Sequence, residues 1–282
     1  MKHAFSFLLT LAFLNIMLVS CDRQDKEPPE LPPLESMKFD FSKFNVEDTK
    51  AADDFLKSAN INTMVNYEYA KANVGVFSFI LGVTLIVPVT TFVNSFSQQP
   101  VFLGDATWQW SSEYTALGGT YYARLVGQVR SSDVKWEMYI SRTGIGAFDE
   151  FKWYEGASLL DGSGGEWLLN HSQNFQEPML QIDWTRSGEE VGWIRYEIVR
   201  ELDNNRNANV YYGSSIEAEL TDEAMNASYN IHVYDIWTIQ DFADVNIEWS
   251  TTEYYGHVKS PLFYSDDEWH CWDSYGYDTT CE

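Results

Sequence analysis

Residues 180–185 read Leu-Gln-Ile-Asp-Trp-Thr, a strict alternation of apolar and polar side chains. Successive side chains of a β-strand point to opposite faces of the sheet, so this pattern predicts a strand that is buried on one face and solvated on the other. The same alternation recurs in residues 135–140 and 245–249. Together these segments predict a sheet with one apolar face and one polar face.

More strand-like segments follow one another from residue 106 onward, without a helical segment between them. The further candidates are residues 106–115, 119–129, 148–155, 165–170, 191–200, 208–220, 227–238 and 254–260. Turn sequences such as Gly118-Gly119 and Ser187-Gly188 separate them. Strands joined by short turns pair antiparallel with their neighbours in sequence. We therefore expect a mainly β fold, a single antiparallel up-and-down sheet or barrel-like domain over residues 106–270, packed on an N-terminal helical segment.

Residues 45–94 supply that helical segment. They combine helix-forming and apolar residues and contain no tryptophan, although the chain has 11. Asn45 or Asp48 could cap a first short helix, and a second helix is expected over residues 63–87. Pro88 should end or kink the second helix, because proline has no N–H to donate.

The second helix belongs to an uncharged stretch between Lys71 and Asp105, in which residues 74–93 approach the length of a membrane span. A spanning helix is therefore an alternative. Glycine, serine, threonine and proline interrupt the apolar run and no basic cluster flanks it, so we favour a buried helix around which the sheet curls. Gly75, Ser78 and Gly82 would form a seam of small side chains against the sheet.

The composition excludes one class of partner. The chain has 282 residues and a net charge of −24. Such a surface repels phosphate backbones, so we expect no binding of nucleic acid. No phosphate loop, dinucleotide fingerprint or nucleophile motif occurs, and we assign no catalytic residue, no metal site and no cofactor.

The N-terminus carries an export signal. Met1-Lys2-His3 precedes an uncharged apolar run that ends in Leu18-Val19-Ser20-Cys21. This pattern resembles the lipobox of bacterial lipoproteins. The resemblance implies that residues 1–20 are a signal peptide and that Cys21 becomes the first residue, carrying acyl chains such as palmitate. We therefore expect an exported protein that is anchored by lipid in the cell envelope, at the outer membrane in preference to the inner one. The sequence does not say whether the protein lies on the periplasmic side or on the cell surface.

Two further features fit an exported, anchored chain. Residues 22–36 hold four of the eight prolines, so residues 21–36 are expected to form a semi-rigid tether ahead of one mature domain at 37–282. With Cys21 acylated, Cys271 and Cys281 remain as a pair, and a disulfide would close the tail at 271–282. A metal site that uses His270 with these two cysteines is the alternative.

Aromatic side chains are the first candidates for a binding surface. Several occur as adjacent or alternating pairs, so that some must point away from the core; we single out Trp108, Trp110, Trp153, Trp193, Tyr212 and Tyr255. The expected function is the non-enzymatic binding of a glycan or an apolar small molecule. A structural or assembly role with a partner protein is the alternative, and a polysaccharide hydrolase comes third. The sequence leaves the oligomeric state open.

Overall fold

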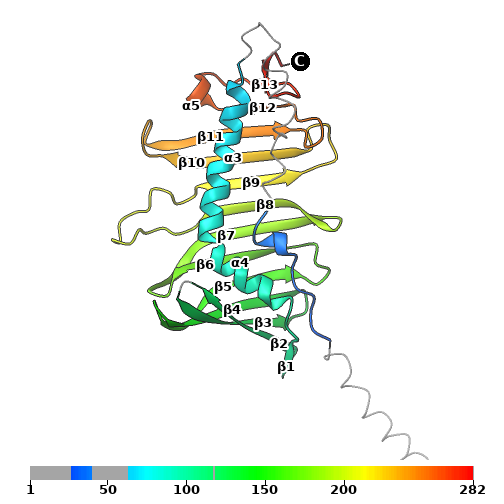
Figure 1. Cartoon of the computed structure of the whole chain (residues 1–282), viewed down its shortest axis with the longest axis vertical. Coiled ribbons are helices and arrows are strands. Elements are labelled where there is room, and N and C mark those ends of the chain that lie inside the picture. The colour runs from blue at the N-terminus through cyan, green and yellow to red at the C-terminus, as the bar shows by residue number, and fades with distance from the viewer. Residues whose placement is uncertain (1–26, 40–62, 117, 282) are drawn as a thin grey trace, which may run out of the picture.

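A computed structural model describes residues 27–39, 63–116 and 118–281. The expected signal peptide, the acylated Cys21 and the first short helix after Asn45 lie outside these residues. Within them, the chain forms one antiparallel sheet with helices on one face (Figure 1).

The sheet is an up-and-down meander in which every strand pairs with its neighbours in sequence. The strands are β1 (Val101–Gly104), β2 (Thr107–Ala116), β3 (Gly119–Val129), β4 (Asp133–Gly144), β5 (Phe148–Leu159), β6 (Gly164–Ser172), β7 (Phe175–Ser187), β8 (Glu190–Ile198), β9 (Ser215–Leu220), β10 (Ala227–Asp235), β11 (Asp241–Trp249), β12 (Gly256–Lys259), β13 (His270–Trp272) and β14 (Asp278–Thr279). The predicted fold class is confirmed. Of its two variants the open sheet is found, because β1 and β14 are the edges of the described sheet.

The strand predictions fail mainly where a strand is short. The strands β1, β13 and β14 were not predicted, because two to four residues are too few to display an alternation. The strand expected over residues 208–220 begins only at Ser215, since the preceding residues form turns and an isolated bridge between Leu202 and Ala208.

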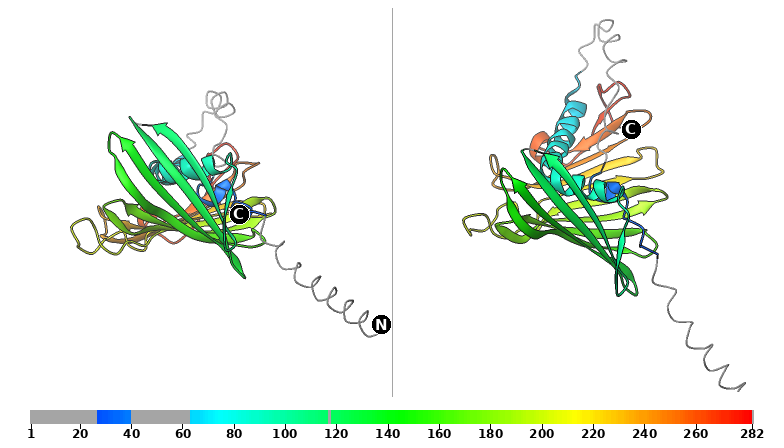
Figure 2. Two further views of the ribbon diagram at one scale, coloured as in Figure 1. Left: turned by 90° about the horizontal axis from the view of Figure 1, so that it is seen from below. Right: turned by 60° about the horizontal axis from the view of Figure 1, so that its bottom comes forward.

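Two consecutive helices, α3 (Val65–Thr84) and α4 (Ile86–Ser95), cross the strands along one face of the sheet. The helix α3 contacts β12, β13 and β14, whereas α4 contacts β2 and β3. The helices thus run from the last strands to the first, and β1–β4 curl toward them (Figure 2). The break falls at Leu85, because Pro88 has no N–H for the carbonyl group of Thr84.

The small-residue seam predicted for α3 is wrong. The helix packs on the sheet through Tyr67, Ala70, Val74 and Leu81. Gly75 is exposed, and a Cβ atom added to Gly75 or Gly82 would meet nothing within 4 Å. The side chain of Ser78 lies outside the described part of the helix. Larger side chains bury more apolar area than glycine, which explains why they occupy the contact. None of the described helices is both long and apolar enough to cross a membrane.

We call the sheet face under α3 and α4 the covered face. Seven of the eleven tryptophans are buried there, and six of them pair directly with a glycine on a neighbouring strand: Gly127 with Trp108 and Trp136, Gly156 with Trp167, Gly165 with Trp184, and Gly256 with Trp249 and Trp272. A Cβ atom on Gly127 would lie 2.5 Å from Cζ3 of Trp136. Each glycine therefore leaves room for an indole ring that lies across the neighbouring backbone.

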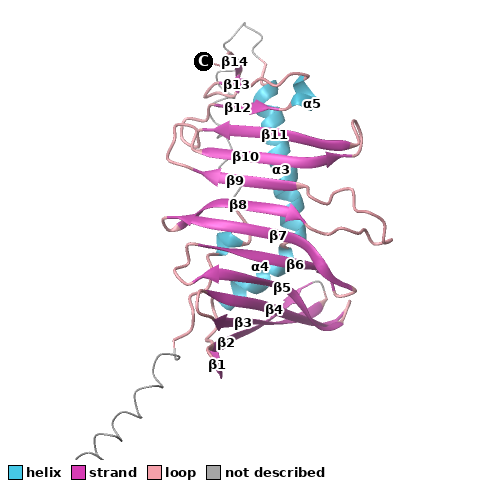
Figure 3. Cartoon of the chain, turned by 180° about the vertical axis from the view of Figure 1, so that it is seen from behind, coloured by secondary structure: helices cyan, strands magenta, loops and turns pink. Residues whose placement is uncertain are grey.

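The opposite side, the open face, is polar and carries no helix (Figure 3). One row of paired residues crosses seven strands from β6 to β12 and consists of Glu166, Asp183, Arg195, Glu217, Asn230, Asn246 and Lys259. Arg195 forms ion pairs with Glu197 at 2.9 Å and with Glu217 at 3.7 Å. The alternation in the sequence thus separates a tryptophan-rich core from a charged surface.

The segment expected to be a tether contributes to the core. Pro32 and Ser36 are buried, and η1 (Leu34–Ser36) contacts β7, β8 and α4. The indole Nε1 of Trp167 donates a hydrogen bond to Oγ of Ser36 (3.1 Å), and the backbone N–H of Phe39 donates to the Tyr196 hydroxyl (2.9 Å). A hydrogen bond offsets the cost of burying an indole N–H, and Ser36 provides the acceptor for Trp167. The packed domain therefore begins near residue 31 instead of residue 37.

The C-terminal tail holds the beginning of α3. Cys271 and Cys281 form a disulfide, and the loop between them carries Asp278. The Asp278 carboxylate accepts hydrogen bonds from the backbone N–H groups of Asn66 (2.9 Å) and Val65 (3.2 Å) and from the Thr63 hydroxyl. These N–H groups have no partner within the helix, so a residue from the far end of the chain caps α3.

Candidate functional site

Two of the six predicted binding aromatics are part of the core. Trp108 is 3% exposed and Trp110 is 4% exposed, both on the covered face. The ring of Trp110 lies 5.7 Å from that of Trp136, and the ring of Trp108 lies 5.0 Å from that of Phe102. The prediction that Trp108 and Trp110 present their rings to a ligand is therefore wrong. Their alternation with polar residues identified the strand correctly, but it does not say which face meets solvent.

The other four aromatics are spread along the sheet and do not form one site. Trp153 packs against Phe148 and Phe151 on β5. Trp193 lies on the open face of β8, paired with Thr185 and Glu219. Tyr212 is exposed in the loop before β9.

Tyr255, the last of the six, precedes β12 and lines a surface hollow of about 440 Å³. The same hollow includes the acidic residues Asp222, Glu223 and Glu253. Across the described parts of the chain, no group of three His, Cys, Asp or Glu side chains is placed to hold a metal ion.

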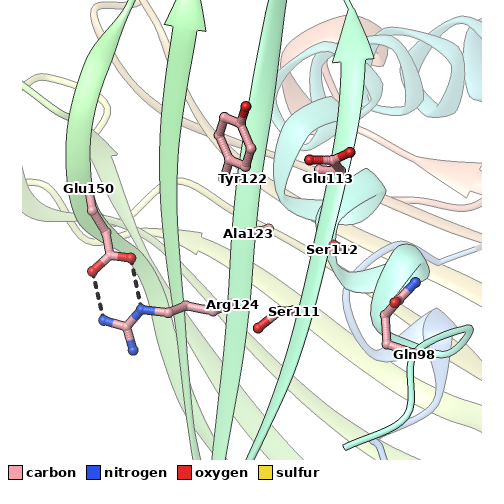
Figure 4. A pocket seen from close by; sticks show the side chains of 8 residues that line it. All are labelled: Gln98, Ser111, Ser112, Glu113, Tyr122, Ala123, Arg124 and Glu150. Carbon is pink, nitrogen blue, oxygen red and sulfur yellow. Dashed lines mark hydrogen bonds and ion pairs between the residues drawn. The ribbon is translucent and has the colours of Figure 1, made fainter.

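The candidate site is a larger hollow at the β1–β5 end of the sheet (Figure 4). It has a volume of about 470 Å³, within the range of roughly 300–1,000 Å³ that small-molecule sites occupy, and it opens to solvent. Strands β2, β3 and β5 and the turn after α4 supply its lining, which consists of Gln98, Ser111, Ser112, Glu113, Tyr122, Ala123, Arg124 and Glu150.

The β2–β3 hairpin positions most of these side chains. The turn at Gly118-Gly119 sets a register in which Ser111 pairs with Arg124 and Glu113 pairs with Tyr122. Side chains of directly paired residues share one face of a sheet, so the four lie together. The Tyr122 side chain is 44% exposed, and its ring stands at one side of the hollow with Glu113 beside it (Figure 4).

Arg124 and Glu150 form the rigid part of the site. Nε of Arg124 donates to Oε2 of Glu150 (2.8 Å), and Nη2 donates to Oε1 (2.7 Å), a bidentate ion pair across β4. The guanidinium of Arg124 also lies 4.0 Å from the ring centre of Tyr139. Tyr139 is on β4, the strand between β3 and β5. The hydrogen bonds from Arg124 lower the pKa of the Glu150 carboxyl against the opposing effect of burial, and the same bonds raise the pKa of Arg124.

This arrangement can bind a polar ligand by hydrogen bonds and ring contact. Hydroxyl, amide, guanidinium and carboxylate groups offer both donors and acceptors, and the exposed Tyr122 ring offers an apolar face beside them. A carboxylate held in its ionised form by an arginine is a poor general acid, because that role needs a raised pKa.

Sequence reasoning singled out none of the residues of this site. It missed Glu113, Tyr122 and Arg124. The signal was present in the predicted turn at Gly118-Gly119, because counting outward from it pairs Glu113 with Tyr122. The contact between Arg124 and Glu150 spans two strands and depends on the side-chain rotamers, which no local pattern reveals.

Comparison of this chain with protein-family models, with curated proteins and with solved structures finds no match. The functional argument therefore depends on the geometry of the chain itself.

Proposed function

We propose that this chain is a lipid-anchored protein of the bacterial cell envelope that binds a glycan in the hollow formed by β2, β3 and β5. The observation that carries the proposal is the exposed ring of Tyr122 next to the hydrogen-bonding side chains of Ser111, Glu113 and Arg124. A sugar ring has an apolar face that stacks on an aromatic ring and hydroxyl groups that need both donors and acceptors. The lipobox pattern that ends at Cys21 supports the anchor.

The lining favours a glycan over an apolar small molecule. An apolar ligand gains affinity from an enclosed and largely hydrophobic site. This hollow is open, and six of its eight lining side chains are polar or charged, with Tyr122 and Ala123 as the exceptions. Binding of an apolar molecule here would displace water from the Glu113 carboxylate and offer it no hydrogen bond in return, which costs free energy.

The same geometry speaks against polysaccharide hydrolysis at this site. Glycosidases use one carboxylic acid to protonate the leaving oxygen and a second carboxylate opposite it. Glu150 is bound to Arg124 and has a lowered pKa, so it stays ionised at neutral pH. Both oxygens of Glu150 accept hydrogen bonds from Arg124, so Glu150 is not free to act as the second carboxylate opposite Glu113.

A glycan-binding screen followed by calorimetry tests the proposal. The protein should bind one class of glycan, and Tyr122→Ala should weaken binding about tenfold, which corresponds to about 1.4 kcal/mol. Tyr275→Ala is the matched control, because Tyr275 is 45% exposed but lies outside the hollow, before β14. Binding of no glycan, or equal losses in both variants, would refute the glycan proposal.

The anchor has an independent test. Cells fed with a labelled fatty acid should incorporate the label into the wild-type chain but not into Cys21→Ala. Label in both variants, or in neither, would contradict lipid attachment at Cys21.

An assembly role with a partner protein is the second candidate, and one observation favours it. β1 pairs with β2 only as far as Gln109, so in the described structure the outer edge of β2 from Trp110 to Ala116 faces no strand. Unpaired strand edges accept a strand from another chain. A photocrosslinker at Thr115 in intact cells should then give a discrete adduct that the same group at Trp237 does not give. Without that adduct this role has no support.

A further inference from the structure

An apolar patch is exposed where α4 passes into β1. Five large side chains within eleven residues are each between 38% and 59% exposed, namely Val93, Phe96, Val101, Phe102 and Leu103. We call these five residues the end patch. Apolar side chains exposed singly are ordinary, but several of them gathered on neighbouring elements are typical of a contact surface.

The end patch belongs to the uncharged stretch of the chain. No charged residue lies between Lys71 and Asp105, although the whole chain has a net charge of −24. This net negative charge lies on the rest of the chain and repels anionic lipid headgroups and other copies of the same protein. The end patch is therefore a part of the surface that can approach a bilayer without that repulsion.

The chain enters the domain close to the end patch. Segment 27–33 starts beside the end of the sheet that β1–β3 form (Figures 1 and 2), and the following η1 contacts α4. Five residues lie between Cys21 and residue 27, and the six steps from one to the other span at most about 20 Å. If Cys21 carries lipid, this short connection holds the β1 end of the sheet at the membrane.

The geometry of β1 distinguishes a bilayer from a protein partner. Alternate side chains of a strand point to opposite faces, so Val101 and Leu103 lie on one side of the edge and Phe102 lies on the other. A protein surface would cover one of these sides. The interfacial region of a bilayer surrounds an inserted edge and accommodates apolar groups on both sides of it.

We propose that the end patch inserts into the interface of the membrane that holds the anchor, so that the sheet stands on its β1 edge with β14 outermost. This inference rests on the proposed lipid anchor. One or two acyl chains and an apolar patch would then act together, as membrane association by two signals requires. The glycan hollow, at the same end of the sheet, would lie close to the membrane surface.

The test uses the acylated full chain in vesicles of phosphatidylethanolamine and phosphatidylglycerol. With Cys21 acylated and Cys271 bonded to Cys281, a Val101→Cys variant offers a single thiol for an environment-sensitive dye. We expect nitroxide-labelled lipids to quench this dye at least twofold. Val210→Cys is the matched control, because Val210 is also an exposed valine but lies in the loop before β9, and its dye should remain unquenched.

Three outcomes overturn the inference in distinguishable ways. If the protein sediments with the vesicles but the dye at position 101 is not quenched, the anchor stands and the end patch does not insert. If the protein does not sediment with the vesicles, the anchor fails and the insertion with it. If the dye at position 101 quenches itself as the protein concentration rises, without nitroxide lipid, the patch is a contact between copies of this chain.

Discussion

On β4, Trp136 is fully buried on the covered face, whereas its neighbours Lys135 and Glu137 form an ion pair of 2.9 Å on the open face. The first side chain fills space over Gly127, and the other two exchange contacts with water for contacts with each other. Burial of a tryptophan stabilises a fold by several kcal/mol, whereas an exposed ion pair contributes at most about 1 kcal/mol. The covered face therefore determines whether this chain folds. The side chains of the open face, including Arg124 and Glu150 of the candidate site, contribute little to stability and can vary with the ligand that the protein binds.

The largest expected effect is on the covered face itself. Trp136→Ala should lower the free energy of unfolding by about 3–5 kcal/mol, because it leaves a cavity over Gly127 and removes the hydrogen bond from Nε1 to Ser158. Trp193→Ala on the open face is the control and should cost less than about 1 kcal/mol. Chemical denaturation measures both. Similar losses in the two variants would break the distinction between the faces.

The next largest effect is expected from the disulfide in the tail, which we expect to help hold α3 on the covered face. Replacing both Cys271 and Cys281 by serine should lower the free energy of unfolding by about 3 kcal/mol, since the disulfide restricts the unfolded chain. The loop that is released carries Asp278, so amide exchange at the start of α3 should accelerate more than exchange in β3 and β4. Uniform acceleration throughout the sheet would show that the tail does not hold the helix locally.

A smaller effect isolates the cap. Asp278→Ala removes the acceptor of the N–H groups of Val65 and Asn66, and we expect a loss of about 1 kcal/mol in denaturation experiments. Asp278→Asn is the matched control, because it keeps one of the two acceptor oxygens and should therefore lose less than the alanine variant. If the asparagine variant loses as much as the alanine variant, charge rather than hydrogen bonding dominates at this end of α3.

The smallest expected effect on stability comes from the ion pair between Arg124 and Glu150 in the candidate site. The pKa of Glu150 is lowered in the folded protein, so its ion pair with Arg124 stabilises the fold above the ordinary glutamate pKa of 4.5 and is lost as the pH falls through the lowered value. Both side chains are partly exposed, which limits the effect to less than about 1 kcal/mol. Wild type and Glu150→Gln should therefore differ slightly at pH 7 and converge once the pH falls below the lowered pKa of Glu150. A difference that grows on acidification would contradict this sign.

The sequence predicted the sheet well because alternation is a local property. The strand at residues 119–129 was predicted at its observed bounds, since glycines mark the turn before it and the polar residues Arg130, Ser131 and Ser132 form the turn after it. Which face of the sheet is buried is not a local property of the sequence. The same alternation fits a buried or an exposed Trp108, and the packing of α4 on β2 determines that Trp108 is buried. The seam on α3 failed for a related reason, because small residues permit a close approach but do not require one.

The site was harder to predict than the fold. Its members come from β2, β3, β5 and the turn after α4, so their proximity follows from register and from the curl of the first strands. The register of the β2–β3 hairpin could have been counted from the sequence. The curl could not, because it depends on where the tryptophans and α4 pack.

The cap of α3 by Asp278 has a consequence for biosynthesis. These partners are 212 residues apart, and at typical rates of synthesis Asp278 leaves the ribosome roughly 10 to 40 s after Asn66. During that interval the apolar side of α3 lacks the strands β12, β13 and β14 that shield it. The helix α3 must therefore wait for the residues around Asp278, and the nascent polypeptide depends on a chaperone or on delayed collapse until these residues have been synthesised.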